Sequence, residues 1–394
     1  MQTTFILSHM YRSNLIVSIL ALTFFILSFS AKAENLALKN PYIVIDASSG
    51  DILEGQNIND RWYPASLTKL MTAYVTFKAI KAGDIEAGSP VVISNAARKQ
   101  PPSKMGYKKG VQLRIDTALK IIIIKSANDV SHALGEAVAG NLKNFVARMN
   151  SEARRLGMTN TQFANSNGLH SANQYSSARD MALLSAQILK EFPQYAYMFE
   201  AAAIKTPVKT HYSYNLLLER FKGANGMKTG FVCASGYNLV GSAKRNGRSL
   251  ITVVMGTSSQ TERAVSAAHL LNTGFQNASS NIGNIYNSVT RGGNPKNMRP
   301  ILCTEKARSS RYDPGAGQAK IKSSHLHPRQ VSSKILNITT GGIDGPVSAA
   351  SFVSIRQIPI PTKRPQKILN VGKVVLKTIG NAATGQIPLP TKRP

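Results

Sequence analysis

The sequence predicts an α+β (mixed α/β) fold in which helices flank a mostly antiparallel sheet. Three observations support this class. Strand-like runs stand near both ends of residues 34–275, several helices lie between them, and two of the runs are joined by an Asn-Gly turn. Apolar residues make up 43% of the 394 residues, which is enough for a real core and excludes a wholly disordered chain.

The first predicted elements are two short strands and a long helix. Tyr42–Asp46 is rich in β-branched residues, a Ser-Ser-Gly turn follows it, and Asp51–Glu54 returns as a second strand. Ser66–Lys81 has apolar residues over a broad face and no Gly or Pro, which predicts a helix. The same reasoning predicts further helices over Ile115–Ile124, Ser126–Val138, Leu142–Leu156, Ala178–Phe192 and Thr261–Leu271.

A hairpin completes the predicted sheet. Tyr237–Lys244 and Ser249–Met255 are both strand-like, and the Asn246-Gly247 pair between them is typical of a tight hairpin turn. Strands from the two ends of this region can therefore pair in one sheet, with the helices packed on its faces.

The chain is strongly basic, and its charge is unevenly distributed. Lys and Arg number 48 against 19 Asp and Glu, a formal net charge of +29. Residues 34–275 hold 28 basic and 16 acidic residues, a net of +12, whereas residues 276–394 hold 18 basic and three acidic residues, a net of +15. Such a charge indicates a polyanionic counterpart, which could be nucleic acid, an anionic membrane surface or an acidic polymer.

The N-terminus has the features of an export signal. Arg12 precedes the apolar run Leu15–Leu27, and Ala31-Lys32-Ala33 matches the small-x-small pattern of signal peptidase sites. The run is shorter than the ~20 residues of a membrane-spanning helix. We therefore expect residues 1–33 to be a signal peptide that directs the protein to the periplasm, with an uncleaved anchor as the alternative. Export argues against nucleic acid as the partner.

Residues 276–394 differ in composition from residues 34–275. Ser, Asn, Gly, Pro, Lys and Arg dominate, and Gln357–Pro365 (QIPIPTKRP) recurs as Gln386–Pro394 (QIPLPTKRP). The prolines oppose helix and central strand. We expect a mostly disordered basic tail that binds an anionic envelope polymer, a membrane surface or, through the repeat, a protein.

The first of three functional motifs is a serine and a lysine at the start of a predicted helix. Ser66 and Lys69 are one helical turn apart, so their side chains share a face. A serine hydroxyl needs a neighbouring base to become a nucleophile, and a lysine can be that base if burial or a nearby cation lowers its pKa. The alternative is a capped helix with a solvated lysine.

The second and third motifs offer polar groups to a cleft. Ser126 and Asn128 stand where one predicted helix ends and the next begins, and both can face a cleft if the backbone there is not helical. Lys228 and Thr229 offer a cation and a hydroxyl for a carboxylate, and Gly230 permits close approach to the backbone. Taken alone, the second motif is typical of an N-cap and the third of an exposed edge strand.

The three motifs together are much more specific than any one of them. They occur in the order Ser-x-x-Lys, Ser-x-Asn, Lys-Thr-Gly, with spacings of 60 and 102 residues, which is the motif set of β-lactamases and penicillin-binding proteins. With the matching stretches Asn167–Leu169, Tyr175–Ala182 and Gly226–Phe231, residues 36–275 resemble the serine D-alanyl-D-alanine carboxypeptidases, the low-molecular-mass penicillin-binding proteins. The resemblance implies a β-lactamase/transpeptidase-like fold with a helical subdomain.

The resemblance also implies a mechanism. Ser66 would attack the carbonyl between the two terminal D-alanines of a peptidoglycan stem peptide, and Lys69 would take its proton. Ser126 would relay a proton to the leaving D-alanine, and the backbone N–H groups of Ser66 and Phe231 would form the oxyanion hole. Water would then hydrolyse the acyl-enzyme, whereas a β-lactam would acylate Ser66 and leave slowly.

The remaining residues that the resemblance assigns bind the substrate. Asn128 would hold the substrate backbone and Lys69, and Lys228 and Thr229 would bind the terminal carboxylate. Arg263 resembles the family's basic residue near that carboxylate, although a solvated helix arginine is the alternative. The full set assigned to substrate binding is Asn128, Lys228, Thr229, Gly230, Phe231 and Arg263.

Two rival functions share parts of this pattern. A β-lactamase of the same fold would need a deacylating base, usually in a Glu-x-x-Leu-Asn segment, and none occurs between the second and third motifs. A non-catalytic cell-wall-binding protein would not need the Ser66–Lys69 pair. We expect no cofactor and no metal, because His132, His170 and His211 lack metal-ligand spacing.

The two cysteines leave one question open. Cys233 and Cys303 cannot form a disulfide framework or a four-ligand zinc site by themselves. An oxidising periplasm permits a disulfide between them, but Cys303 lies in the predicted tail, so the pairing stays undecided.

Overall fold

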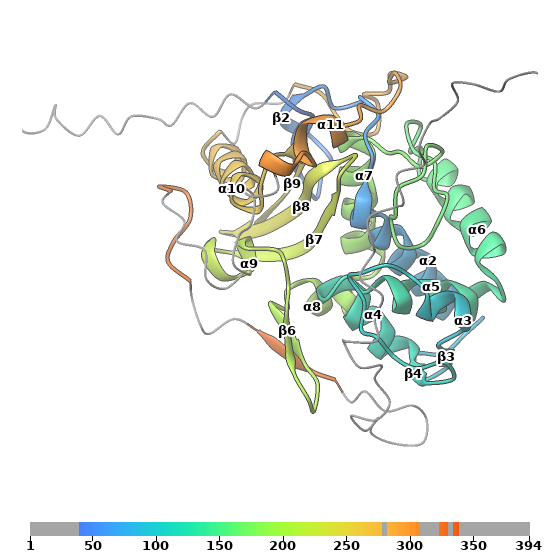
Figure 1. Cartoon of the computed structure of the whole chain (residues 1–394). Coiled ribbons are helices and arrows are strands. Elements are labelled where there is room, and N and C mark those ends of the chain that lie inside the picture. The colour runs from blue at the N-terminus through green and yellow to red at the C-terminus, as the bar shows by residue number, and fades with distance from the viewer. Residues whose placement is uncertain (1–38, 278–281, 308–322, 330–333, 339–394) are drawn as a thin grey trace, which may run out of the picture. The chain divides into compact units, whose positions relative to one another are not determined.

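The computed structural model describes residues 39–277, 282–307, 323–329 and 334–338 (Figure 1). It contains a five-stranded antiparallel sheet with the strand order β2-β1-β9-β8-β7, in which β1 from one end of the predicted domain pairs with β9 from the other. This confirms the predicted α+β class. The strands are β1 (Tyr42–Asp46), β2 (Ile52–Gln56), β7 (Ala224–Val232), β8 (Gly236–Arg245) and β9 (Arg248–Thr257).

Strands β8 and β9 form the predicted hairpin. Asn246 and Gly247 make the turn with φ values of 49° and 79°, which are left-handed conformations that Asn and Gly tolerate better than other residues. Strand β7 pairs with β8 and is the edge strand of this sheet. Its other side lies against the 3₁₀ turn η1 (Ala65–Leu67), which carries Ser66.

The sheet separates two apolar clusters, because side chains alternate between the faces of a strand. Ile43 and Ile45 of β1 belong to one cluster, and Val44 between them belongs to the other. Helix α10 (Gln260–Gln276) packs on the Val44 face, and α7 (Ala178–Glu191) packs on the Ile43 face (Figure 1). The sheet is thus covered by helices on both sides, as the fold class requires.

A helical subdomain carries the first two motifs. Helix α2 (Thr68–Ala82) is buried over most of its length, and it ends at Gly83 in a left-handed conformation. Helix α5 (Asn128–Ala139) packs beside it. The other elements of this subdomain are β3 (Pro90–Val92), α3 (Asn95–Arg98), β4 (Gln112–Arg114), α4 (Ile115–Ile124) and α6 (Leu142–Arg155).

Short elements follow α7 and form a second, smaller sheet. Its strand order is β10-β5-β6, and β10 runs parallel to β5. The elements are η2 (Pro193–Tyr195), α8 (Ala196–Phe199), β5 (Ala203–Lys205), β6 (Thr210–Tyr212), α9 (Leu217–Arg220) and β10 (Ile335–Asn337).

The described residues beyond Phe275 pack on the domain, which their composition did not indicate. Ile285 is fully buried, and its carbonyl oxygen accepts a hydrogen bond from Nε of the buried Arg179 at 2.7 Å. Leu302 is buried in the same core cluster. The folded unit therefore extends past the boundary at residue 275 that the sequence predicts.

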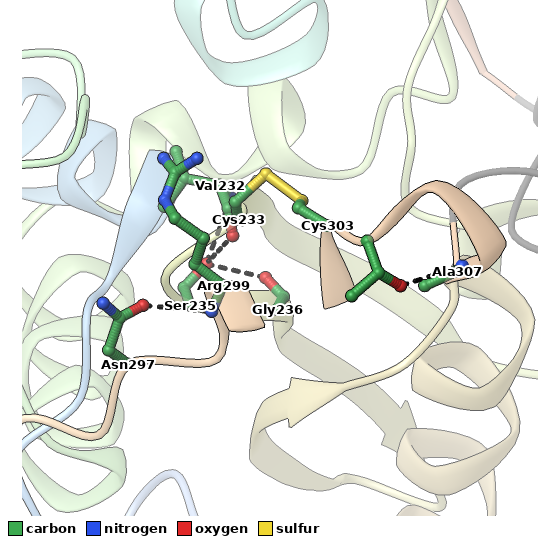
Figure 2. Close-up of a disulfide and its surroundings, with 9 residues drawn as sticks. Val232, Cys233, Ser235, Gly236, Asn297, Arg299, Cys303 and Ala307 are labelled. Carbon is green, nitrogen blue, oxygen red and sulfur yellow. Dashed lines mark hydrogen bonds between the residues drawn. A yellow bond between two sulfur atoms is a disulfide. The ribbon is translucent and has the colours of Figure 1, made fainter. Parts of the chain in front are cut away.

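A disulfide fastens this later segment to the sheet. Cys233, in the turn between β7 and β8, is bonded to Cys303, which directly follows α11 (Arg299–Leu302) (Figure 2). The N–H of Met298 also donates to the carbonyl oxygen of Ala234 at 2.9 Å. The pairing that the sequence left undecided is thus present, because the segment around Cys303 is packed on the domain.

The predicted signal peptide, residues 1–33, and both copies of the QIP repeat lie outside the described residues. Among the residues that are described, no helix is both long and apolar enough to cross a membrane.

The disulfide is expected to contribute measurably to stability. It closes a loop with a sequence separation of 70 residues, and such a link restricts the unfolded chain. The double variant Cys233→Ser/Cys303→Ser should lose about 2–4 kcal/mol of unfolding free energy in urea. Reductant should lower the stability of the native protein but leave the double variant unchanged. Equal urea midpoints for the oxidised protein and the variant would contradict this expectation.

Candidate active site

The turn that bears Ser66 is held in a strained conformation. Ala65, the residue before the serine, has a φ of 48°, a left-handed value that is costly for any residue with a Cβ atom. The side-chain amide of the buried Asn238 on β8 donates to the carbonyl oxygens of Tyr63 at 2.9 Å and Pro64 at 3.2 Å. These bonds fix the turn against the sheet, so Ser66 has one defined position.

Two glycines allow the surrounding backbone to approach this turn. A Cβ atom on Gly168 would lie 1.9 Å from the carbonyl oxygen of Ala65, and one on Gly230 would lie 2.9 Å from the nitrogen of Ser66. Both distances are too short for a side chain. The serine turn is therefore packed between the loop that contains Gly168 and the edge strand β7.

Lys69 lies beneath Ser66 with its amine hydrogen-bonded on three sides. Its Nζ is 3.0 Å from Oγ of Ser66, 2.8 Å from Oδ1 of Asn128 and 2.5 Å from the carbonyl oxygen of Asn167. The side chain is fully buried, with 0% of its surface exposed. The first two predicted motifs therefore meet at one amine, and Asn167 adds a backbone acceptor.

The surroundings of Lys69 favour its neutral form. Burial is the main cause that holds its pKa well below the ordinary value, and the positive charge of Lys228 lowers it further. The carboxylate of Asp129 acts in the opposite direction but more weakly. A neutral amine beside a serine hydroxyl can accept the hydroxyl proton, which is the chemistry that the motif predicts.

Lys228 is a second buried lysine. Its side chain is 2% exposed, and its Nζ donates to the carbonyl oxygen of Thr229 at 3.1 Å. Burial, followed by the charges of Arg263 and Lys125, lowers the pKa of Lys228 to about 7. The third motif thus places at the site a cation that gives up its proton easily in the absence of an anion.

Ser126 and Asn128 face the site because the backbone between α4 and α5 is not helical. Ser126 has a φ of 63°, and the helix begins only at Asn128. Nδ2 of Asn128 donates to the carbonyl oxygen of Pro101 at 2.9 Å, which turns its Oδ1 toward Lys69. The predicted helix start at Ser126 is therefore two residues early, whereas the prediction that both residues face a cleft is confirmed by the lining described below.

Arg263 lies on the α10 side of the site. It is buried, and its Nη2 donates to the carbonyl oxygen of Tyr214 at 2.8 Å. Its guanidinium also lies 5.7 Å from the ring centre of Tyr237. The alternative of a solvated helix arginine is wrong for Arg263, since the helix turns its side chain into the domain.

A cleft of about 280 Å³ unites these residues. Lys69 and Lys228 lie beneath its surface, and every other predicted site residue lines it. Sequence reasoning assigned no role to several further lining residues, and none of the described residues that line the cleft is Asp or Glu. The lining residues are Ser66, Pro102, Ser103, Ser126, Asn128, Asn167, Gly168, Leu169, Tyr214, Thr229, Gly230, Phe231, Val232, Tyr237, Gln260 and Arg263.

Comparison with known proteins identifies the family. The profile of the D-alanyl-D-alanine carboxypeptidases, Peptidase_S11, matches residues 28–259. This chain belongs to that family. It is 38% identical over 263 residues to the D-alanyl-D-alanine carboxypeptidase DacA of Haemophilus influenzae, a match that covers 64% of this chain and 67% of the relative. It is 36% identical to DacC of Escherichia coli over 60% of each chain.

Solved structures of carboxypeptidases and penicillin-binding proteins have the same fold. The D-alanyl-D-alanine carboxypeptidase DacD of Francisella tularensis matches with a TM-score of 0.59 and 31% identity, over 61% of this chain and 71% of that one. The penicillin-binding protein D2 of Listeria monocytogenes, solved with cefotaxime bound, matches with a TM-score of 0.56 and 27% identity, over 61% and 99% of the two chains. The β-lactamase/transpeptidase-like fold that the motifs imply is thereby confirmed.

The cleft also contains groups that no side-chain pattern marks. The carbonyl oxygen of Asn167 is a backbone atom, and only the matching stretch Asn167–Leu169 pointed to its segment. Tyr214 and Gln260 line the cleft from segments outside all three motifs. Polar residues of this kind are common on protein surfaces, so only their position in the fold distinguishes the ones that line the cleft from the others.

Replacing Gly168 by Ala is expected to damage the site far more than the fold. The added methyl group would collide with the backbone of Ala65 and displace the Ser66 turn, and displacements of ~1 Å can cost about 100-fold in rate. Gly140→Ala is a matched control, because Gly140 also has a left-handed φ but has no atom within 4 Å of the new methyl group. The acylation rate with a fluorescent penicillin should fall about 100-fold in Gly168→Ala only. Similar rates for the two variants would refute the role given to this contact.

Lys228 is expected to destabilise the protein in a pH-dependent way. Its pKa of about 7 in the folded protein is below the ~10.4 of an unfolded chain, so the unfolded chain binds more protons between these pH values and stability rises with pH across that window. Lys228→Met should therefore be more stable than the native protein by on the order of 4 kcal/mol at pH 6, with a smaller difference at pH 10. Urea unfolding at both pH values measures this. Lys143→Met, at an exposed position, is the control. A difference in unfolding free energy between Lys228→Met and the native protein that stays constant across pH would count against the explanation.

Proposed function

We propose that this protein removes the terminal D-alanine from peptidoglycan stem peptides. The observation that carries the proposal is the buried amine of Lys69, 3.0 Å from Oγ of Ser66, at the base of a cleft. Lys228 and Thr229 lie at the same cleft and supply a cation and a hydroxyl for a terminal carboxylate. Family membership supports the same reaction.

Acylation begins at Ser66. Its Oγ attacks the carbonyl carbon between the two D-alanines while the neutral amine of Lys69 takes the hydroxyl proton. The backbone N–H groups of Ser66 and Phe231 stabilise the negative charge on the carbonyl oxygen. The C–N bond then breaks, Ser126 relays a proton to the leaving amine, and D-alanine departs. Water hydrolyses the ester on Ser66 and releases the shortened peptide.

The substrate is oriented by charge at one end of the cleft. The terminal carboxylate binds Lys228 and Thr229, and this contact keeps Lys228 protonated although burial favours its neutral form. Arg263 adds a fixed positive charge on the same side and holds the loop at Tyr214 in place. Asn128 binds both Lys69 and the substrate backbone. These contacts place the scissile bond over Ser66.

β-Lactams would acylate the same serine and leave slowly. A carboxylate near the ester would be needed to activate water efficiently, and the described lining of the cleft contains no Asp or Glu. The buried Asp129 is engaged elsewhere, because it accepts hydrogen bonds from the N–H groups of Met105 and Gly106. These observations favour a penicillin-sensitive carboxypeptidase over a β-lactamase.

We also propose that the enzyme acts in the periplasm, attached to the envelope by charge. The Cys233–Cys303 disulfide supports an oxidising compartment. The net charge of +15 on residues 276–394 supports an anionic wall polymer or membrane surface as the counterpart. Sequencing the N-terminus of the exported protein tests the first point, with Glu34 as the expected first residue. Salt extraction of the protein from envelopes, with and without residues 339–394, which lie beyond the packed segments, tests the second.

Replacing Ser66 by Ala should abolish the reaction. The variant should show no fluorescent-penicillin label and at least about 10⁴-fold slower release of D-alanine from a pentapeptide, because the nucleophile is missing. Ser151→Ala, at an exposed position on α6, should behave like the native protein. Mass analysis of products from the pentapeptide and from a cross-linked muropeptide also reveals any endopeptidase activity.

Two outcomes would redirect the proposal. A native protein that neither takes the label nor shortens the pentapeptide would instead be a wall-binding protein. Rapid release of hydrolysed penicillin by the native protein would make it a β-lactamase.

A further inference from the structure

The segment joined by the disulfide stands at the end of the cleft opposite Lys228. Cys233 follows Phe231 and Val232, which both line the cleft at the end of β7. The disulfide and the bond from Met298 to Ala234 hold α11 beside this turn (Figure 2). A part of the chain outside all three motifs therefore borders the active site.

Arg299 is the residue of this segment that reaches toward the cleft. Figure 2 shows its side chain extending from α11 toward Val232. Its charge also contributes, after burial, to lowering the pKa of His170, whose neighbour Leu169 lines the cleft. Arg299 is exposed, and no carboxylate among the described residues forms an ion pair with it. Its guanidinium is thus available to an anion at the rim.

The direction of the substrate follows from the proposed function, on which this inference rests. The leaving D-alanine and its carboxylate lie at Lys228 and Thr229, and the reacting carbonyl lies over Ser66. The acyl part of the stem peptide must then extend along the end of β7, past Phe231 and Val232. Arg299 stands where that part of the peptide leaves the cleft.

We propose that Arg299 forms a subsite for a free carboxylate in the acyl part of the stem peptide. A guanidinium pairs with a carboxylate through two parallel hydrogen bonds, a geometry that a lysine cannot reproduce. Stem peptides offer two such groups: the α-carboxylate of the γ-linked glutamyl residue, and the side-chain carboxylate of a diaminopimelyl residue. The disulfide holds the segment that presents Arg299, so it positions the subsite without touching the substrate.

The test compares Arg299→Gln with Lys296→Gln on four peptides. Lys296 is exposed in the same segment but lines a separate depression with Lys39 and Glu262, so its replacement removes an equal charge at a different place. The peptides are the full pentapeptide, its glutamyl amide, its lysine analogue, and an N-acylated D-alanyl-D-alanine tripeptide with neither carboxylate. Release of D-alanine gives kcat and KM for each.

The expected result is a loss confined to peptides that carry the recognised carboxylate. Arg299→Gln should lower kcat/KM for the full pentapeptide about 10-fold, mainly through KM, and Lys296→Gln should not. The modified peptide on which Arg299→Gln and the native protein no longer differ identifies the carboxylate.

Three results would overturn the subsite. They are an equal loss of kcat/KM in Arg299→Gln on all four peptides, no loss of kcat/KM on any of them, or the same loss in Lys296→Gln. A native protein that hydrolyses none of the peptides would refute the proposed function and the subsite together. Hydrolysis without any effect of Arg299→Gln would refute the subsite alone.

Discussion

A lysine amine without access to water is the constraint on which this structure depends. Helix α2 buries Lys69 completely, and a buried ammonium is costly unless its donors are satisfied. The fold supplies three acceptors, from Ser66, Asn128 and Asn167, and none of them is a carboxylate. A carboxylate in place of one of these acceptors would favour the protonated form of Lys69, and the amine could then no longer accept a proton. The buried Asp129 does not take that place, because backbone N–H groups occupy its oxygens.

Such a site needs rigid surroundings, and two strained residues show how these are obtained. Ala65 and Ser126 both have left-handed φ values, and each stands at a hydroxyl that the proposed mechanism uses. Strain of this kind persists only where neighbouring structure leaves no alternative. Gly168 and Asn238 provide that restraint at Ala65, one by close backbone contact and the other by hydrogen bonds. Packing against the sheet thus fixes the position of the hydroxyl oxygen of Ser66.

The sequence predicts the parts of this site that depend on side-chain identity and local pattern. The hairpin around Asn246, the helices and the three motifs all follow from such signals, and the structure brings the motifs into one cleft. The carbonyl of Asn167 escaped prediction because any residue type carries one. The packing of the segment around Cys303 escaped as well, because short apolar contacts such as those of Ile285 give no periodic signal. The segment's position depends on tertiary partners, the buried Arg179 among them.

The two buried lysines connect substrate binding to catalysis. Lys228 loses its proton near pH 7 in the absence of an anion, and its charge is one reason why the pKa of Lys69 is low. A substrate carboxylate beside Lys228 would favour the protonated form of that lysine. The carboxylate brings an equal negative charge, so the carboxylate and the protonated Lys228 together add no net charge beside Lys69. The amine of Lys69 therefore stays neutral because it is buried, and the terminal carboxylate of a substrate can bind Lys228 without favouring a proton on Lys69.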